Sequence, residues 1–164
     1  MTSPGAQSAD MQTVHASTGK PPWAARVWAT WIDLLAFVLV IIPFVGYAQV
    51  TAVPREYSDA VDLTPAGIAA AWAGVLIYLV LWSWNRYVRQ ARTGQTIGKR
   101  RQGLRVVDAH GRTPTAGRLV VRDLAHVLDI LPACLGLLWP IWDRRGQTFA
   151  DKVAGTVVVH DGVR

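Results

Sequence analysis

The sequence predicts a mainly α-helical, polytopic membrane protein. We expect two clear transmembrane helices, a third helical segment that is broken and either spans or re-enters the membrane, and a small cytoplasmic β pairing. Three observations predict this class. Of the 164 residues, 51% are apolar and only 17% are charged, whereas soluble domains average about 25% charged residues. The net charge is nevertheless +6. Three long apolar stretches occupy residues 27–50, 66–84 and 124–142.

The chain before the first apolar stretch differs in composition from the rest. Residues 1–22 are rich in Ser, Thr, Gln, Gly and Pro and show no periodicity, so we expect a disordered tail followed by one domain at 23–162. The single cysteine, Cys134, excludes an intramolecular disulfide framework and a multi-cysteine zinc site.

The first two apolar stretches are long enough to cross a bilayer, which takes about 20 mostly apolar residues in a helix. The stretch at 27–50 contains one charge, Asp33, and the stretch at 66–84 contains none. The first stretch is too long for the apolar core of a signal peptide, and no convincing cleavage site follows it. We therefore expect two transmembrane helices.

The third apolar stretch, at 124–142, contains Asp129 and is interrupted by Pro132. Two interpretations stay open. Residues 119–142 either cross the membrane once, leaving the C-terminus outside, or enter and leave on the cytoplasmic side as a re-entrant or interfacial hairpin. We favour the hairpin because the basic pair Arg144-Arg145 follows the stretch, as is typical of an inner membrane boundary.

The distribution of charge predicts the topology. Basic residues concentrate at 85–118, where Asp108 is the only acid, while 51–65 is acidic overall. The positive-inside rule therefore places 85–118 and the N-terminus in the cytoplasm and 51–65 outside. We expect a multi-pass protein of the cell (plasma) membrane. The partner expected for 85–118 is the layer of anionic lipid headgroups, and not nucleic acid.

An internal repeat with an offset of 52 residues follows the second and third apolar stretches. Each copy ends in a β-like run, at 104–108 and at 156–160. Strands need partners for their backbone groups, so we expect the two runs to pair with each other. The repeated glycines and polar residues are candidate site residues: Gly94, Gln95, Thr96, Gly98 and Lys99 in the first copy, and Gly146, Gln147, Thr148 and Gly155 in the second.

Charged residues at the heads of the apolar stretches are the candidate functional groups. Arg26 and Asp33 lie seven residues apart, on one helix face and about 10 Å apart along its axis. An ionisable group inside a membrane needs a partner or a water-filled cavity. Asp33 is therefore part of a structural ion pair or of an ion or proton site. Arg122 and Asp129 have the same spacing and form a secondary candidate charge pair.

Other features limit the function classes. No set of nucleophile, base and orienting residue is visible, and the histidines lack metal-ligand spacing. We therefore expect no catalytic residue, no metal site, no cofactor and no enzymatic activity. Small residues in the second stretch permit close helix approach, within the chain, in a homo-oligomer or with a membrane partner: Gly67, Ala70, Ala71 and Gly74.

Taken together, these motifs resemble the RDD family of small bacterial membrane proteins. The carrying residues are Trp23, Arg26 and Ile32-Asp33, then 93–99 with 103–108, and finally Asp151-Lys152 with 154–159. Arg101 and Gln102 depart from the family pattern, which usually has apolar residues there.

The resemblance implies that the arginine and two aspartates of the family name correspond to Arg26, Asp33 and Asp151. It also implies transport of an unidentified ligand, with sodium/proton exchange in some members, as a candidate activity. We thus expect a transport or ion-translocating component, in which these three charges form the site. The alternative is a non-transporting membrane scaffold or accessory module that assembles with a partner protein.

Overall fold

The computed structural model describes residues 20–57 and 59–161, which form helices and two small antiparallel sheets. Most of the predicted tail at 1–22 lies outside these residues. The chain divides into two compact units, one formed by 33–84 and the other by the segments before and after it. Helix α2 (Trp23–Val50) contributes to both units.

The unit at 33–84 is a helical hairpin made by the second part of α2 and by α3 (Pro65–Ser83). Its tip is a short ladder between β1 (Val53–Pro54) and β2 (Val61–Asp62). Helix α3 begins after Thr64, whose hydroxyl accepts a hydrogen bond from the Gly67 N–H group at 3.1 Å. Such a cap satisfies a donor that the first turn of a helix leaves free.

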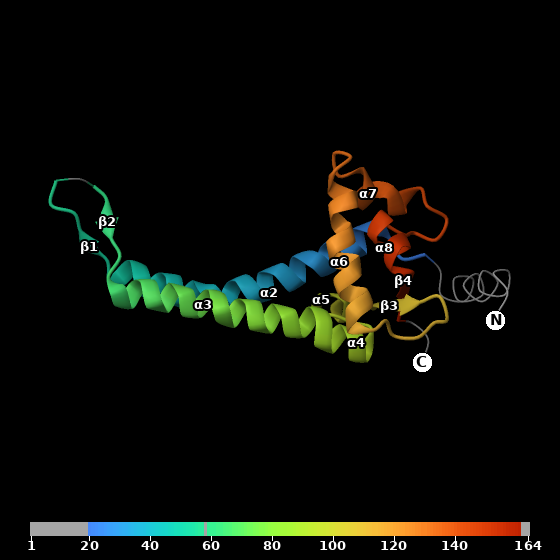
Figure 1. Ribbon diagram of the computed structural model, residues 1–164, viewed down its shortest axis with the longest axis horizontal. Coiled ribbons are helices and arrows are strands. Elements are labelled where there is room, and N and C mark those ends of the chain that lie inside the picture. Colours follow the sequence, from blue (N-terminus) through green and yellow to red (C-terminus); the bar gives the residue numbers. More distant parts are fainter. Residues whose placement is uncertain (1–19, 58, 162–164) are drawn as a thin grey trace. The chain divides into compact units, whose positions relative to one another are not determined.

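Glycines allow α2 and α3 to lie side by side in this hairpin (Figure 1). A Cβ atom at Gly74 would lie 2.7 Å from the Cβ of Phe44, and one at Gly67 would lie 3.2 Å from the Cα of Ala48. These two glycines of the small-residue face are therefore used within the chain. Assembly with another chain through the half-buried Ala70 and Ala71 stays a prediction.

Within residues 20–57 and 59–161, two helical stretches are long and apolar enough to cross a membrane, as the sequence predicted: Trp23–Val50 and Pro65–Thr93. The second stretch consists of α3, the π-helix η1 (Trp84–Arg89) and α4 (Gln90–Thr93). Helical turns satisfy the backbone hydrogen bonds internally, which a bilayer interior requires.

The other unit contains the internal repeat. The first copy forms α5 (Ile97–Arg101) and β3 (Leu104–Asp108), and the second forms α8 (Phe149–Ala154) and β4 (Thr156–His160). The two strands pair antiparallel, which confirms the predicted pairing.

The register of this sheet follows the repeat. Val106 lies opposite Val158, and these two valines are equivalent residues of the two copies, 52 positions apart. An approximate local two-fold axis therefore passes between them. One face of the sheet buries Leu104, Val106 and Val158 against Ala29 at the start of α2. The core of this unit thus joins both copies of the repeat to the start of α2.

The third apolar stretch is broken, as expected. Helix α6 (Ala116–Ile130) and the short helices α7 (Leu135–Leu138) and η2 (Trp139–Ile141) meet at an angle of 111°. The bend is tight because Gly136 packs directly against Asp129, where a Cβ atom would overlap the aspartate. The indole N–H group of Trp23 donates to the Leu137 carbonyl at 2.9 Å, which ties the bent segment to the start of α2.

Candidate functional site: a buried charge cluster

Asp151 lies in the first turn of α8 and is fully buried. Its position is set by a reciprocal capping box with Thr148. The Thr148 hydroxyl accepts from the Asp151 N–H group at 3.0 Å, and the Asp151 carboxylate accepts from the Thr148 N–H group at 3.2 Å. This arrangement fixes the backbone of the first turn of α8 and holds the carboxylate beside the N-cap residue.

Two arginines from distant parts of the chain converge on this carboxylate. The Nε of Arg122, in α6, donates to Oδ1 at 2.7 Å, and Nη1 of Arg26, in α2, donates to Oδ2 at 3.5 Å. The Thr156 hydroxyl, at the start of β4, donates to Oδ1 at 3.2 Å. The Thr148 N–H group donates to Oδ2. Both oxygens of Asp151 therefore accept hydrogen bonds from protein donors.

The cluster holds Asp151 in its charged form. Burial disfavours the carboxylate and by itself would raise the pKa of Asp151. The positive charges of Arg122 and Arg26, together with the hydrogen bond from Thr148, outweigh burial and keep this pKa below its ordinary value. The site is thus an ionised aspartate clamped by two arginines.

Asp129 caps the same helix from α6. Its Oδ1 accepts from the Phe149 N–H group at 2.8 Å, and its Oδ2 lies 2.7 Å from the Nδ1 of His126. The carboxylate is fully buried. A negative charge at a helix N-terminus is stabilised by the free N–H groups there, so Asp129 orients α8 and thereby Asp151.

The two members of the secondary charge pair singled out from the sequence have different partners in the structure. Arg122 and Asp129 are both buried, but Arg122 pairs with Asp151 and Asp129 caps α8. The reason is their spacing, since seven residues separate them by about 10 Å along the helix. Each residue therefore contacts a different part of α8.

The repeated Gly-Gln-Thr motifs build the same local structure twice. Gly94 and Gly146 have φ angles of +74° and +60°, which favour glycine because it lacks a Cβ atom. The amide of Gln95 then donates to the Leu104 carbonyl at 2.9 Å, and that of Gln147 donates to the Thr156 carbonyl at 2.8 Å. Each glutamine thus binds the first residue of the strand that follows its own helix.

The repeat extends to the helix caps. Thr96 caps α5 by accepting from the Lys99 N–H group at 3.2 Å, as Thr148 caps α8. The side-chain oxygen of Asn85 accepts from the Ile97 N–H group at 3.0 Å, the role that Asp129 has at α8. Gly98 is buried within α5, and Gly155 ends α8 at a φ of +61°.

The two copies carry opposite charges at the position of Asp151. Lys99 and Asp151 are equivalent residues of the repeat and are both buried. The arginine clamp therefore belongs to the second copy alone.

Comparison with known proteins identifies the group to which this fold belongs. The family model described as the RDD family matches residues 20–155. The chain belongs to the RDD family. It is 39% identical over 158 residues to the proline-rich antigen of Mycobacterium leprae, an alignment that covers 84% of this chain and 61% of that protein.

A second relative of this RDD protein is the proline-rich antigen homolog of Mycobacterium tuberculosis (strain ATCC 25618 / H37Rv). It is 33% identical over 156 residues, with 84% of this chain and 62% of that protein covered. The chain spans about three-fifths of the length of the curated relatives it matches. No solved structure matches it.

The structure brings together two of the three RDD charges singled out from the sequence. Arg26 and Asp151 form an ion pair in the unit that holds the repeat. Asp33 is half-buried on α2 and belongs to the hairpin unit. Sequence reasoning missed the main partner of Asp151, which is Arg122. The repeated seven-residue spacing had singled out Arg122, but spacing alone did not show which acid it contacts.

Proposed function

We propose that this RDD protein is a non-transporting, membrane-embedded scaffold or accessory module that assembles with a partner protein. In this proposal the buried RDD charges hold the repeat unit together and do not form an ion path. The observation that carries it is the state of Asp151, whose two oxygens both accept hydrogen bonds from protein donors at zero exposure. Each oxygen accepts two hydrogen bonds, so protein donors occupy the acceptor sites that an ion would need.

The membrane location is supported by the orientation of α6. Its buried positions include Arg122 and Asp129, whereas most of its large apolar side chains are exposed. Leu124, for example, is 69% exposed. A helix on a water-soluble protein has the reverse arrangement, because apolar surface is costly in water. Charges inside and apolar residues outside are favourable when the outer medium is lipid.

We further propose that the N-terminus and the repeat unit lie on the cytoplasmic side of the plasma membrane, following the positive-inside rule. The bent pair of α6 with α7 and η2 would then be a re-entrant or interfacial hairpin. Its 111° bend supports a segment that turns back and not a straight span.

Accessibility to a thiol reagent tests the membrane location. In a Cys134→Ala background, Leu124→Cys and Arg112→Cys both place a thiol at a position that is exposed in the structure. In inside-out membrane vesicles, a membrane-impermeant maleimide is expected to label position 112 and to leave position 124 unlabelled. Equal labelling at both positions would contradict the proposal.

Ion translocation is the second candidate function, and Asp33 is the observation that favours it. This carboxylate is half-buried in a helix long enough to cross a membrane, and ionisable groups inside membrane segments often mark ion or proton paths. In this alternative Asp33 binds the ion, while Arg26 and Asp151 act as charge partners or a gate.

Reconstitution distinguishes the two functions. The scaffold proposal expects no sodium-dependent proton flux in vesicles that contain the folded full chain. The transport alternative expects flux that Asp33→Asn abolishes and that Glu56→Gln, a matched change outside the helices, preserves. Chemical crosslinking in native membranes tests the assembly with a partner. Recovery of the monomer alone would argue against the scaffold proposal.

A further inference from the structure

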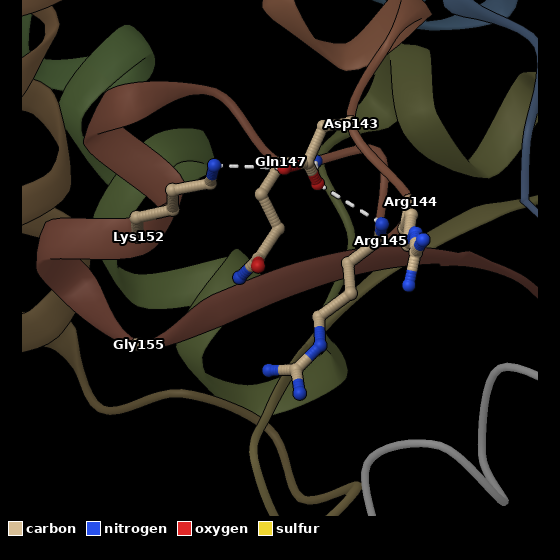
Figure 2. A pocket seen from close by; sticks show the side chains of 6 residues that line it. All are labelled: Asp143, Arg144, Arg145, Gln147, Lys152 and Gly155. Atoms are coloured by element: carbon tan, nitrogen blue, oxygen red, sulfur yellow. Dashed lines mark hydrogen bonds and ion pairs between the residues drawn. The ribbon is translucent and has the colours of Figure 1, made fainter. Parts of the chain in front are cut away.

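A pocket of about 530 Å³ lies beside the loop between η2 and α8 (Figure 2). Its volume falls in the range typical of small-molecule sites, about 300–1,000 Å³. The lining residues are mostly polar or charged: Asp143, Arg144, Arg145, Gln147, Lys152 and Gly155. None of them belongs to the Asp151 cluster.

The loop that forms this pocket is held in place by its own acid. The Asp143 carboxylate accepts from the N–H groups of Arg145 and Gln147, both at 3.0 Å, and from Lys152 Nζ at 2.7 Å. From the other end of the chain, Lys20 donates to the Asp143 carbonyl at 2.9 Å. These hydrogen bonds therefore hold the loop backbone and the Lys152 amine in place before any ligand arrives.

The charge of the lining favours an anion. The lining contains three cations, Arg144, Arg145 and Lys152, and one carboxylate, that of Asp143. Protein donors already occupy both oxygens of this carboxylate. In Figure 2 the side chains of Arg145 and Gln147 extend into the same space, with Lys152 on its other side. Guanidinium groups bind phosphate oxygens through two parallel hydrogen bonds, so a pair of adjacent arginines is suited to a phosphate group.

Exposed apolar residues adjoin the charged lining. Trp142 is 66% exposed and Ile141 is 47% exposed, and both directly precede Asp143. The ring of Trp139 lies 5.4 Å from Lys152 Nζ. Tryptophans next to basic side chains are typical of the level of lipid headgroups. The surroundings thus suit a ligand with a phosphate group and an adjoining apolar part.

We propose that this pocket binds an anionic phosphate group, carried by a phospholipid headgroup or by a soluble phosphorylated compound. The lipid source rests on the proposed membrane location, whereas phosphate binding by the pocket does not. The site lies outside the basic segment at 85–118. The charge distribution of the sequence predicted headgroup contact for that segment and not for this pocket.

The test uses the full chain purified in a non-ionic detergent and has two arms. Native mass spectrometry measures retention of phosphatidylglycerol against phosphatidylcholine, and ³¹P NMR line broadening measures binding of inorganic phosphate. The wild type is expected to bind in at least one arm. Lipid retention without phosphate binding identifies the headgroup source, and phosphate binding without lipid retention identifies a soluble source. Binding in both arms supports recognition of the shared phosphate group.

The discriminating variant is Arg144→Gln with Arg145→Gln, and its matched control is Arg100→Gln with Arg101→Gln. Both variants remove an Arg-Arg pair, and Arg100 and Arg101 are exposed residues outside the pocket. The pocket variant is expected to lose at least about tenfold in affinity. The control lies in the segment expected to attract anionic headgroups in general, so it is expected to lose less in the lipid arm and to keep wild-type binding in the phosphate arm.

Two results would overturn the proposal: no binding by the wild type in either arm, or equal losses in the two variants, which would indicate general charge attraction. If gel filtration shows that the double variant does not fold, the single Arg144→Gln replaces it, because that side chain is exposed. The phosphate arm is measured without a membrane, so its outcome is independent of the proposed location.

Discussion

Arg122 and Asp151 form a buried ion pair in which the guanidinium Nε lies 2.7 Å from a carboxylate oxygen, with side-chain exposures of 8% and 0%. The pair connects α6, whose outer face is apolar, to α8 in the repeat unit. Because both side chains are buried, removing either one leaves the other as a buried charge without its ion-pair partner.

Replacing Arg122 with Gln is expected to lower the free energy of unfolding by about 3–5 kcal/mol, because breaking a buried pair leaves an unpaired buried charge. Chemical denaturation in detergent, followed by circular dichroism, measures the change. The control is Arg118→Gln. Arg118 is 49% exposed and lies 3.6 Å from Asp108, so its loss is expected to cost at most about 1 kcal/mol. Equal effects of the two substitutions would contradict a special role for the buried pair.

Stability is expected to fall in acid because of Asp151. The folded-state pKa of this carboxyl lies below its ordinary value, since the two arginines and the Thr148 hydrogen bond outweigh burial. The unfolded chain titrates near pH 3.9 and therefore binds the proton first. The stabilisation is complete above that pH and is lost as pH falls through the lower folded-state pKa.

The measurement is the unfolding midpoint as a function of pH in wild type and in Asp151→Asn. The variant is expected to be less stable at neutral pH and to have a shallower acid dependence. Asp108 and Asp143, whose pKa values are also lowered, contribute to the remaining slope. Asp59→Asn, at an exposed position, serves as the control. An unchanged slope in Asp151→Asn would show that the aspartate is not held in its charged form.

The glutamines of the two repeated motifs are both expected to contribute to stability. Gln95→Leu and Gln147→Leu each leave a buried strand carbonyl without its side-chain donor, at a cost of about 1–3 kcal/mol. Gln102→Leu, in the half-buried cap of α5, is the control and is expected to cost less. Thermal unfolding measures all three. A large loss at Gln102 and none at the other two would contradict a common role for the motif.

Gly136 is expected to tolerate no larger side chain. A Cβ atom there would overlap Asp129 at the bend between α6 and α7, so Gly136→Ala must shift the aspartate that caps α8. We expect a loss of about 1–3 kcal/mol in the free energy of unfolding, typical of overpacking. Gly117→Ala meets nothing within 4 Å and is expected to be neutral or stabilising by up to about 1 kcal/mol. Similar results for both glycines would argue against the tight bend.

Topology reporters test the hairpin interpretation of the bent segment. A reporter fused after Arg164 is expected to score as cytoplasmic, and one inserted after Tyr57, in the loop between β1 and β2, as external. The reason is that a re-entrant segment returns the chain to the side from which it entered. An external signal from the C-terminal fusion would instead favour three spans.

Much of this architecture could be predicted from the sequence because local composition determines it. Apolar stretches with the length of a bilayer span predicted α2 and α3, and Pro132 predicted the break that the structure has between α6 and α7. The pairing of β3 with β4 followed from the repeat, because equivalent strands on one side of a membrane can satisfy each other's backbone groups. These features depend on spacing along the chain.

The partners of the buried charges were decided by the tertiary structure. Seven-residue spacing singled out Arg26 with Asp33 and Arg122 with Asp129, but it could not show that both arginines reach Asp151. That convergence depends on how α2, α6 and α8 pack, and so does the use of Asp129 as a helix cap. The sequence by itself determined which segments are apolar and where the charges lie. Only the folded chain determined which charges meet, because burial makes a pairing between distant residues strong enough to be specific.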